Sequence, residues 1–474
     1  MNFFKRLIFI LSLMAISNVF ADECKNFEEK VLSIPPPVDG IVTDGQQERK
    51  DLGLFFHQEY SFQENKFKIK RNKDNFPILK ISFVNNKLPH DSSIVSINGN
   101  DLSKLLDHEI NKLISASSAT VNTKNNSYQI NSENYDLYPF DLEYFTINAI
   151  DEIQTKEGEF KLDYSFQVSH ERPDWINAGR EIGNLTVCPI GELTESTQIY
   201  SPVTNETVFL KQVGYDQDKS FASYDQIYFS KFDKTYSRTT MEGVATIKSD
   251  FDLRTFPFDT QILKLELSPP YPIDYNEENN YPKPYISILN AKKNVFLELD
   301  KYKKSNYLKE WTVIDIGVEN KLDITKSVSA FNRDKLTNTI YDTIFINIIV
   351  ERNTNYFIFK IIIPVFLILS IAWSVMWIPP NQIESRLTTS IVALLALIAY
   401  NFVFNEDLPK LSYLTSLDRY ILLSYLFCAI PTFLTIYFSR ITKKDYKISL
   451  EINKKSRLLG VIIYLISATV IFST

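Results

Sequence analysis

Four long apolar runs stand in the last quarter of the chain, at residues 356–378, 383–404, 419–441 and 458–474. Each run is close to the roughly 20 residues that a helix needs to cross the hydrocarbon core of a bilayer. Only a few residues separate the first two runs, which forces their helices to be antiparallel neighbours. The pattern therefore predicts a four-helix transmembrane bundle over residues 356–474.

The chain before these runs has a different hydrophobic period. In stretches such as residues 141–153, 159–170 and 341–352, apolar or aromatic residues alternate with polar ones, and clusters of turn-forming residues separate the stretches. This period of two is typical of half-buried β-strands. We predict an extracellular all-β sandwich for residues 135–355. Residues 22–134 are then left as an additional N-terminal module of α/β or β type.

The first 21 residues have the features of a secretory signal peptide. Lys5 and Arg6 precede a short apolar stretch, and residues 19–21 end in Ala21 at the expected cleavage position. The stretch is too short for a comfortable membrane span. The mature chain is therefore expected to begin near Asp22, outside the cytoplasm.

The linker between the third and fourth apolar runs is strongly basic. The positive-inside rule places this linker in the cytoplasm, so the large N-terminal region and the C-terminus are both extracytoplasmic. That topology agrees with the signal peptide. The basic residues are Arg440, Lys443, Lys444, Lys447, Lys454, Lys455 and Arg457, against the acidic residues Asp445 and Glu451.

Composition argues against several classes of function. The net charge of −6 gives no bulk attraction for nucleic acid. Glycine is scarce, the four histidines lack metal-ligand spacing, and no nucleophile elbow occurs, so we expect neither an enzyme nor a bound cofactor. Cys428 lies in an apolar run as a small core residue. Cys24 and Cys188 could pair after export, although the sequence does not show that they meet.

Six residues of the second apolar run fall on one stripe of the predicted helix, and the character of this stripe changes along its length. Its cytoplasmic end is acidic and hydroxylated, and its middle and outer parts are apolar. Repeated around an axis, such carboxylates attract cations, and apolar rings can gate a pore by dewetting. The alternative is a buried helix of an ordinary bundle, and Arg386, off the stripe, is expected to point to the cytoplasmic interface. The stripe comprises Glu384, Thr388, Val392, Leu395, Ala399 and Phe402.

Residues 251–267 contain Phe256, Pro257, Phe258 and Asp259, followed by Gln261. This stretch resembles the signature loop of pentameric ligand-gated (Cys-loop type) ion channels.

The flanking cysteines of that loop are absent, because Ser249 and Leu263 occupy their places. Trp311, Arg352 and Pro364 then resemble family positions in the same order, as do the second apolar run and the loop after it. The resemblance covers about residues 137–474. The missing cysteines and the short cytoplasmic linker resemble the prokaryotic branch.

The resemblance implies a homopentamer around a central pore, and we expect it in a bacterial plasma membrane, surrounded by lipid. The acidic end of the stripe adds the expectation that this pore conducts cations. It also implies agonist sites between neighbouring sandwiches and a zone that couples the sandwich to the pore. An ion pair between Asp259 and Arg352 is expected in that zone. The expected coupling residues are Glu157, Phe256, Pro257, Phe258, Asp259, Arg352, Pro409 and Lys410.

Two further groups are candidates for ligand binding, although the sequence leaves the agonist open. Aromatic residues near the expected binding loops suit a cationic ligand, with packing as the alternative. Acidic clusters suit modulatory calcium, with solvated loops as the alternative. The aromatic candidates are Tyr200, Tyr271, Tyr275 and Phe331. The acidic candidates are Asp216, Asp218, Asp274, Glu277 and Glu278.

The N-terminal module faintly resembles a PDZ domain. Residues 52–55 would be its peptide-carboxylate loop, residues 97–99 a turn, and residues 102–114 a helix. An unrelated α/β module is the alternative. For the chain as a whole, the alternatives to a channel are a membrane-anchored periplasmic binding protein without a pore and a tethered enzyme.

Overall fold

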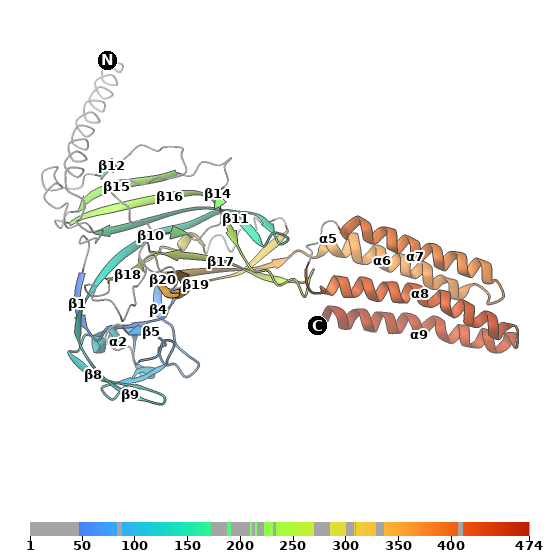
Figure 1. Cartoon of the computed structure of the whole chain (residues 1–474), viewed down its shortest axis with the longest axis horizontal. Coiled ribbons are helices and arrows are strands. Elements are labelled where there is room, and N and C mark those ends of the chain that lie inside the picture. Colours follow the sequence, from blue (N-terminus) through green and yellow to red (C-terminus); the bar gives the residue numbers. More distant parts are fainter. Residues whose placement is uncertain are drawn as a thin grey trace, which may run out of the picture.

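The computed structural model describes residues 47–82, 88–171, 187–190, 209–210, 214–215, 222–230, 234–269, 285–299, 308, 310–328, 336–405 and 411–473. Figure 1 shows an elongated molecule, with β-sheets at one end and a bundle of parallel-lying helices at the other. The two parts meet where β20 (Leu336–Arg352) runs into α5 (Asn355–Phe357). This arrangement confirms the predicted combination of a β-sandwich with a helical bundle.

The described residues contain four helices that are long and apolar enough to cross a membrane. The first span, Asn355–Trp377, is composite, and each of the others is a single helix. The first span comprises α5, the π-helical turn η4 (Ile358–Ile362), α6 (Ile363–Ser374) and the 3-10 turn η5 (Val375–Trp377). The other helices are α7 (Ile383–Asn405), α8 (Ser416–Thr442) and α9 (Tyr446–Ser473).

Helix α9 begins earlier than its apolar run, at Tyr446 rather than near residue 458. Most of the basic linker is therefore helical. The physical reason is that Ser449 and Asn453 of this polar segment are fully buried, so the segment packs against the bundle. Apolar run length underestimates such a helix because its inward-facing residues are polar.

The packing of α9 depends on the absence of a side chain at Gly460. A Cβ atom at this position would lie 1.9 Å from the indole ring of Trp373 in α6. The ring therefore occupies the space that any other residue would need. Tyr464, one turn later, packs on Phe427 of α8 with ring centroids 5.2 Å apart.

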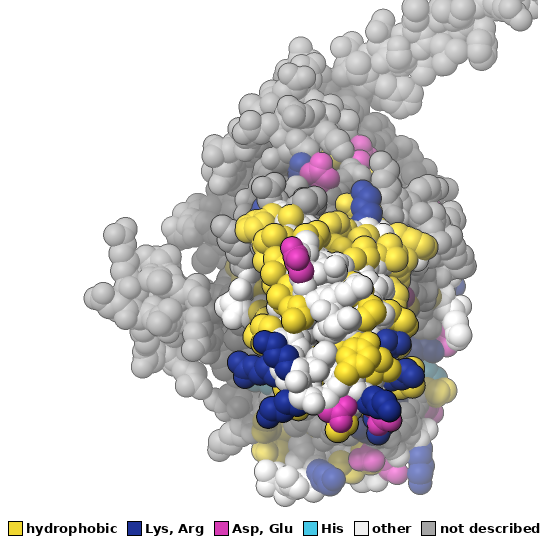
Figure 2. Space-filling model, turned by 90° about the vertical axis from the view of Figure 1, so that its right-hand side faces the viewer, with side chains coloured by type: hydrophobic (Ala, Val, Ile, Leu, Met, Phe, Trp, Pro, Cys, Tyr) yellow, Lys and Arg dark blue, Asp and Glu magenta, His cyan; other side chains and the backbone are white. Residues whose placement is uncertain are grey.

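Basic side chains gather around the free end of the bundle, as Figure 2 shows in a view onto that end. That this end faces the cytoplasm stays a prediction from the positive-inside rule. The exposed basic residues around the turn from α8 to α9 are Arg440, Lys443, Lys444, Lys447, Lys454 and Lys455.

The sandwich consists of two sheets that enclose one hydrophobic core. The larger sheet has the order β1-β10-β11-β16-β15-β12, with β14 on β16 and β18 on β10. Its strands are β1 (Gln47–Asp51), β10 (Glu133–Gln154), β11 (Glu159–Glu171), β12 (Val187–Ile190), β14 (Gly214–Tyr215), β15 (Ala222–Ser230), β16 (Lys234–Lys248) and β18 (Tyr285–Ala291).

The smaller sheet has the order β13-β17-β20-β19-β3-β4. Burial alternates along β17, as expected for a strand with one face on the core. The long β19–β20 hairpin pairs from Trp311 and Arg352 at one end to Val328 and Leu336 at the other. The strands of this sheet are β3 (Gln58–Ser61), β4 (Lys66–Ile69), β13 (Phe209–Leu210), β17 (Thr260–Ser268), β19 (Trp311–Val328) and β20.

The N-terminal module has a hydrophobic core of its own. The turn at Asn98 and Gly99 has two positive φ angles, 50° and 78°, as a tight hairpin turn requires. The predicted helix over residues 102–114 is divided into η2 (Leu102–Lys104) and α2 (Asp107–Ile114). The module's strands are β2 (Leu54–Phe56), β5 (Leu79–Ser82), β6 (Ile94–Ile97), β7 (Asn100–Asp101), β8 (Ser118–Thr123) and β9 (Ser127–Asn131).

The N-terminal region also contributes strands to both sheets of the sandwich. Strand β1 pairs with β10, and β3 pairs with β19. A hairpin of β3 and β4 thus extends the smaller sheet at its β19 edge. Residues before 134 are therefore joined to the sandwich by backbone hydrogen bonds as well as by sequence.

The loop proposed to hold a peptide carboxylate already uses two of its backbone donors. The N–H of Leu52 donates to the carbonyl of Ile114 at 3.1 Å, and the N–H of Gly53 donates to Asp51 Oδ1 at 2.8 Å. A carboxylate ligand would have to replace these acceptors. The geometry therefore does not favour the peptide-binding interpretation of residues 52–55.

A buried histidine in the N-terminal module gives a pH prediction. Burial lowers the pKa of His57 below its ordinary value, opposed by a 2.6 Å contact with Asp91 and reinforced by Lys80 and Lys70. The unfolded chain then binds a proton at a higher pH than the folded chain does. Stability must therefore fall as the pH drops through the ordinary histidine pKa of about 6.5, by at most about 1.4 kcal/mol per pH unit.

Between about pH 7.5 and pH 5.5 we expect the unmodified chain to lose thermal stability, and we expect His57→Gln to flatten that loss. The exposed His108 provides the matched control, since His108→Gln should leave the profile unchanged. Melting profiles of the two variants that coincide would refute this role for His57.

Candidate functional site

The strongest contact at the junction joins the signature loop to the strand that enters the membrane. Arg352, at the end of β20, donates from Nε to Asp259 Oδ1 at 2.7 Å and from Nη2 to Oδ2 at 3.1 Å. The side chains are 5% and 0% exposed. The ion pair expected from the sequence is therefore present, bidentate and buried.

Aromatic rings and an amide complete the surroundings of this ion pair. The guanidinium carbon of Arg352 lies 4.1 Å from the ring centroid of Trp311 and 4.8 Å from that of Phe256. Gln261 donates to Asp259 Oδ2 at 2.6 Å. Trp311 belongs to β19, Gln261 to β17 and Arg352 to β20, whereas Phe256 and Asp259 belong to the loop. These contacts therefore hold the loop and the three strands together.

The same loop contacts the bundle through its backbone. The N–H groups of Ser416 and Leu417, at the start of α8, donate to the carbonyls of Arg254 and Phe256 at 2.9 and 3.1 Å. These are orphan donors of a helix N-terminus, which need acceptors from elsewhere. The sandwich thus caps the third membrane helix.

The far end of the chain also reaches this loop. The ring of Phe258 lies edge-on to the ring of Phe472, near the end of α9, with centroids 5.2 Å apart. Figure 1 shows the C-terminus beside the junction. The loop therefore contacts three helices. Phe256 packs on α5 and accepts a hydrogen bond from Leu417 of α8, and Phe258 packs on α9.

Of the residues predicted for coupling outside the signature loop and β20, the structure describes only Glu157. Glu157 is exposed, in the turn between β10 and β11. Its neighbour Gly158 accepts a hydrogen bond from Ser249 N at 2.9 Å, which brings this turn to the start of the signature loop. Pro409 and Lys410 lie outside the described residues.

Helix α7 has two faces of different character. The buried face carries Arg386, Ser390, Ala393 and Leu397, at helical spacing. The residues predicted to line a pore lie on the opposite face and are all exposed, which argues against a helix buried within its own bundle. They are Glu384, Thr388, Val392, Leu395, Ala399 and Phe402.

The exposed face of α7 is largely apolar beyond its first two turns. Val392, Leu395 and Phe402 are 58%, 59% and 72% exposed. The described part of the chain therefore leaves uncovered a face with a carboxylate at one end, a hydroxyl one turn further and apolar side chains along the rest.

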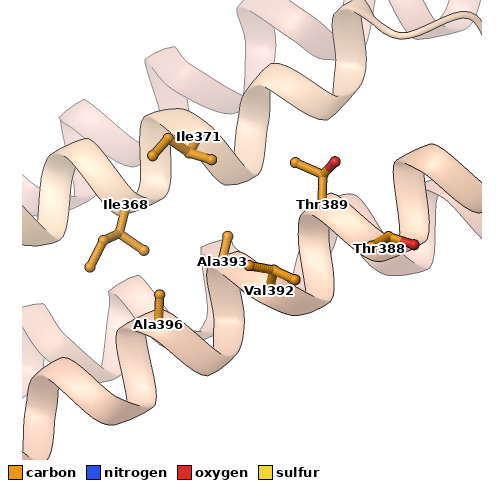
Figure 3. A pocket seen from close by; sticks show the side chains of 7 residues that line it. All are labelled: Ile368, Ile371, Thr388, Thr389, Val392, Ala393 and Ala396. Atoms are coloured by element: carbon orange, nitrogen blue, oxygen red, sulfur yellow. The ribbon is translucent and has the colours of Figure 1, made fainter.

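A groove of about 290 Å³ lies between α6 and α7, on the flank of this exposed face (Figure 3). Thr388 and Thr389 lie toward one end of it, and apolar side chains line the rest. The groove shows that the packing of α6 on α7 is open on this side in a single chain. Its lining residues are Ile368, Ile371, Thr388, Thr389, Val392, Ala393 and Ala396.

The prediction that Arg386 points to the cytoplasmic interface is wrong. Its side chain is fully buried, with Nη2 2.9 Å from Asn453 Oδ1 and 3.3 Å from the sulfur of Met376. Its guanidinium lies 5.5 Å from the ring centroid of Phe438. The reason is that the helical extension of α9, which the apolar run does not show, places Asn453 beside it.

Sequence reasoning also missed two tyrosines that support the first membrane helix. Pro364 has no N–H, so the carbonyl of Lys360 loses its helical donor. The hydroxyl of Tyr400 in α7 donates to that carbonyl, and Tyr420 in α8 donates to the carbonyl of Ile362 at 3.2 Å. Pro364 was the available signal, because a carbonyl freed inside a membrane requires a donor.

The candidates for ligand and calcium binding all lie outside the described residues. They are Tyr200, Tyr271, Tyr275 and Phe331, and Asp216, Asp218, Asp274, Glu277 and Glu278. Cys24 is also outside, so its pairing with Cys188 stays a prediction, whereas Cys428 is a buried free thiol. Among the described residues, no group of three potential ligands could hold a metal ion.

Comparison with known proteins bears on the membrane part of the chain. Residues 361–457 match the family model described as the neurotransmitter-gated ion-channel transmembrane region. This range runs from the first membrane span, through α7 and α8, into α9. The chain is homologous to subunits of ligand-gated ion channels.

Relatives of this kind include subunits of γ-aminobutyric acid receptors. The γ-1 subunit of Homo sapiens is 24% identical over 176 residues, which cover 37% of this chain and 33% of the relative. The ρ-3 subunit of Homo sapiens is 25% identical over 178 residues, with the same coverage. A β-like subunit of Drosophila melanogaster is 24% identical over 95 residues, 20% of this chain and 19% of the relative.

The chain thus spans a third or less of the length of these relatives. Their family consists of ligand-gated ion channels and not of enzymes, which agrees with the expectation from the sequence.

The junction gives a stability prediction. Asp259→Asn would leave the buried guanidinium of Arg352 without its counter-charge, which typically costs about 3–5 kcal/mol. We expect a large loss of thermal stability, followed by the fluorescence of tryptophan, since Trp311 lies against the pair.

The same loop provides a matched control. Asp252 and Arg254 form an exposed pair at 3.3 Å, and exposed pairs contribute little to stability. Asp252→Asn should therefore melt like the unmodified chain. Equal melting of the two variants would show that burial of the Asp259 pair has no special effect.

Proposed function

We propose that this chain is one subunit of a homopentameric ligand-gated ion channel of a bacterial plasma membrane, with a pore lined by the exposed face of α7. The observation that carries the proposal is that this face is uncovered and yet ordered from acidic to apolar along its length. The homology of residues 361–457 to a channel membrane region supports it.

Selectivity is proposed to reside at Glu384. Five carboxylates at one end of a narrow pore attract cations and repel anions, and Thr388, one turn further, supplies hydroxyl oxygens to a partly dehydrated ion. The nearest cation along the helix, Arg386, is fully buried on the opposite face. The sign of the permeant ion thus rests on Glu384 and not on the comparisons.

Gating is proposed to occur at the apolar rings above it. Val392, Leu395 and Phe402 project from the exposed face, and rings of such side chains exclude water from a narrow tube. A small widening admits water and ions. A ligand shifts the closed–open equilibrium only as far as its affinities for the closed and the open state differ. The resulting movement would reach these rings through the sandwich.

The coupling path is proposed to run through two contacts at the junction. Strand β20 carries Arg352 to α5, and the signature loop caps α8 through Ser416 and Leu417. The agonist is expected to bind between neighbouring sandwiches near residues 200, 271, 275 and 331, with calcium as a modulator. Protons, divalent ions, amines and peptides remain candidates for the signal.

The deciding experiment is current through the purified protein in planar bilayers under a salt gradient, with pH, calcium and small amines varied. A gated current that reverses toward the cation potential supports the proposal. Glu384→Gln should move the reversal potential toward zero, because it removes the ring of charge. Reversal toward the anion potential, or no change in this variant, would overturn the assignment of Glu384.

A second variant tests the gate. Leu395→Ser makes wetting of the closed pore easier, so the half-maximal agonist concentration should fall by about tenfold, or about 1.4 kcal/mol. Ile391→Ser, on the exposed side but off the predicted stripe, is the control. If both variants respond alike, Leu395 is not the gate. A monomer in mild detergent would instead favour a membrane-anchored binding protein without a pore.

A further inference from the structure

A buried lysine of the N-terminal module reaches into the sandwich. Lys80, on β5, is 6% exposed, and its ammonium contacts Asp342 on β20, which is 3% exposed. It also donates to Asn320 Oδ1 on β19 at 2.5 Å. Figure 1 shows β4 and β5 of the N-terminal region beside β19 and β20. The charge therefore sits between the module and both strands of the hairpin.

Backbone groups close this contact into a network. Asp342 Oδ2 accepts from the N–H of Leu289 at 3.1 Å, and Asn320 Nδ2 donates to the carbonyl of Leu289 at 3.2 Å. Four strands, β5, β18, β19 and β20, thus meet around one ammonium group. A buried charge pair is costly to break when one partner is removed, and this one has every partner in place.

A second contact holds β19 at the same level. Strand β3 pairs with β19 at Gln58 opposite Asn320, so backbone and side chain fix one residue together. Lys70 also donates to Glu319 Oε1 at 2.7 Å. The N-terminal region therefore contacts the hairpin at two adjacent positions, Glu319 and Asn320.

The position of the Lys80–Asp342 contact along the hairpin indicates what this contact does. Asp342 and Arg352 lie on one uninterrupted strand, ten residues or about 33 Å apart at 3.3 Å per residue. One end of this segment is fixed to Lys80, and the other holds Asp259 and begins the first membrane helix. The strand is thus a direct backbone connection between the module and the start of the membrane helices.

We propose that the N-terminal module is a brace on the β19–β20 hairpin, and that Lys80 is a positioning residue that sets the resting position of Arg352. This inference rests on the proposed channel function, because it assigns to the module a part in gating. Lys80 lies far from the face of α7 and leaves ion selectivity untouched. The module would transmit any ligand or partner of its own through the same strand.

The test compares hydrogen exchange and gating in Lys80→Met. In full-length protein in detergent, amides of residues 341–352 should exchange at least about tenfold faster than in the unmodified chain. In bilayers, the stimulus is protons, calcium or a small amine, whichever opens the unmodified channel. Its half-maximal concentration should change by about fivefold or more, with the reversal potential unchanged. Lys68→Met is the control, since Lys68 pairs with the exposed Glu64 within the β3–β4 hairpin.

A purely structural role gives a different result. If Lys80 only stabilises the module, faster exchange will be confined to residues 54–131 and gating will not change, which overturns the proposal. If Lys80→Met fails to fold, the double variant Lys80→Met with Asp342→Leu replaces the pair by apolar side chains. In this double variant, the amides of β20 should exchange as slowly as in the unmodified chain, and agonist sensitivity should be near normal. If only one of these two measurements returns to its normal value, the proposal is overturned.

Separate results contradict the channel function and the brace. A pentamer that carries no current counts against the proposed function, whereas the exchange measurement on residues 341–352 needs no current and can overturn the brace by itself.

Discussion

A charge that must stay buried fixes how the sandwich stands on the membrane helices. Arg352 is the last residue of its strand and lies three residues before α5. Its guanidinium needs Asp259 and the ring of Trp311 at the same time. Since separating a buried charge from its partner costs several kcal/mol, the loop and the hairpin cannot part at this point without replacing those contacts. Other contacts of the junction are arranged around this requirement.

The described residues include three buried cations with different surroundings. Arg352 and Lys80 each face a carboxylate within a network of hydrogen bonds. Arg386 contacts an amide, a thioether and an aromatic ring. The first two hold elements together through strong directional contacts. The third lies behind Glu384 on the opposite face of α7, so it keeps its charge off the stripe that we assign to the pore.

Much of this organisation follows from the sequence, for identifiable reasons. Membrane helices require long apolar runs, and the period of α7 identifies its exposed stripe, since 3.6 residues per turn leave few alternatives. The ion pair of Asp259 was also predicted, because the residues around it resemble a known loop. These signals are local, or they belong to a motif.

What the sequence did not show depends on distant partners. Nothing near Lys80 indicates a carboxylate 262 positions later, and nothing near Arg386 indicates Asn453. The pairing of β3 with β19 is likewise a matter of topology. The start of α9 was misplaced because its first turns bury polar residues. Long-range pairing is set by how the elements pack, and periodicity carries no information about it.

The close approach of Trp373 to Gly460 has a consequence for the bilayer around the protein. An indole ring in the place of a side chain keeps α9 from sliding along its axis or turning about it. A membrane thicker or thinner than the bundle cannot then be accommodated by moving this helix alone. Tilting of the bundle as one body, or a local change in bilayer thickness, then accommodates the mismatch. Hydrocarbon thickness thus acts on all the helices together, and through Phe472 on the signature loop as well.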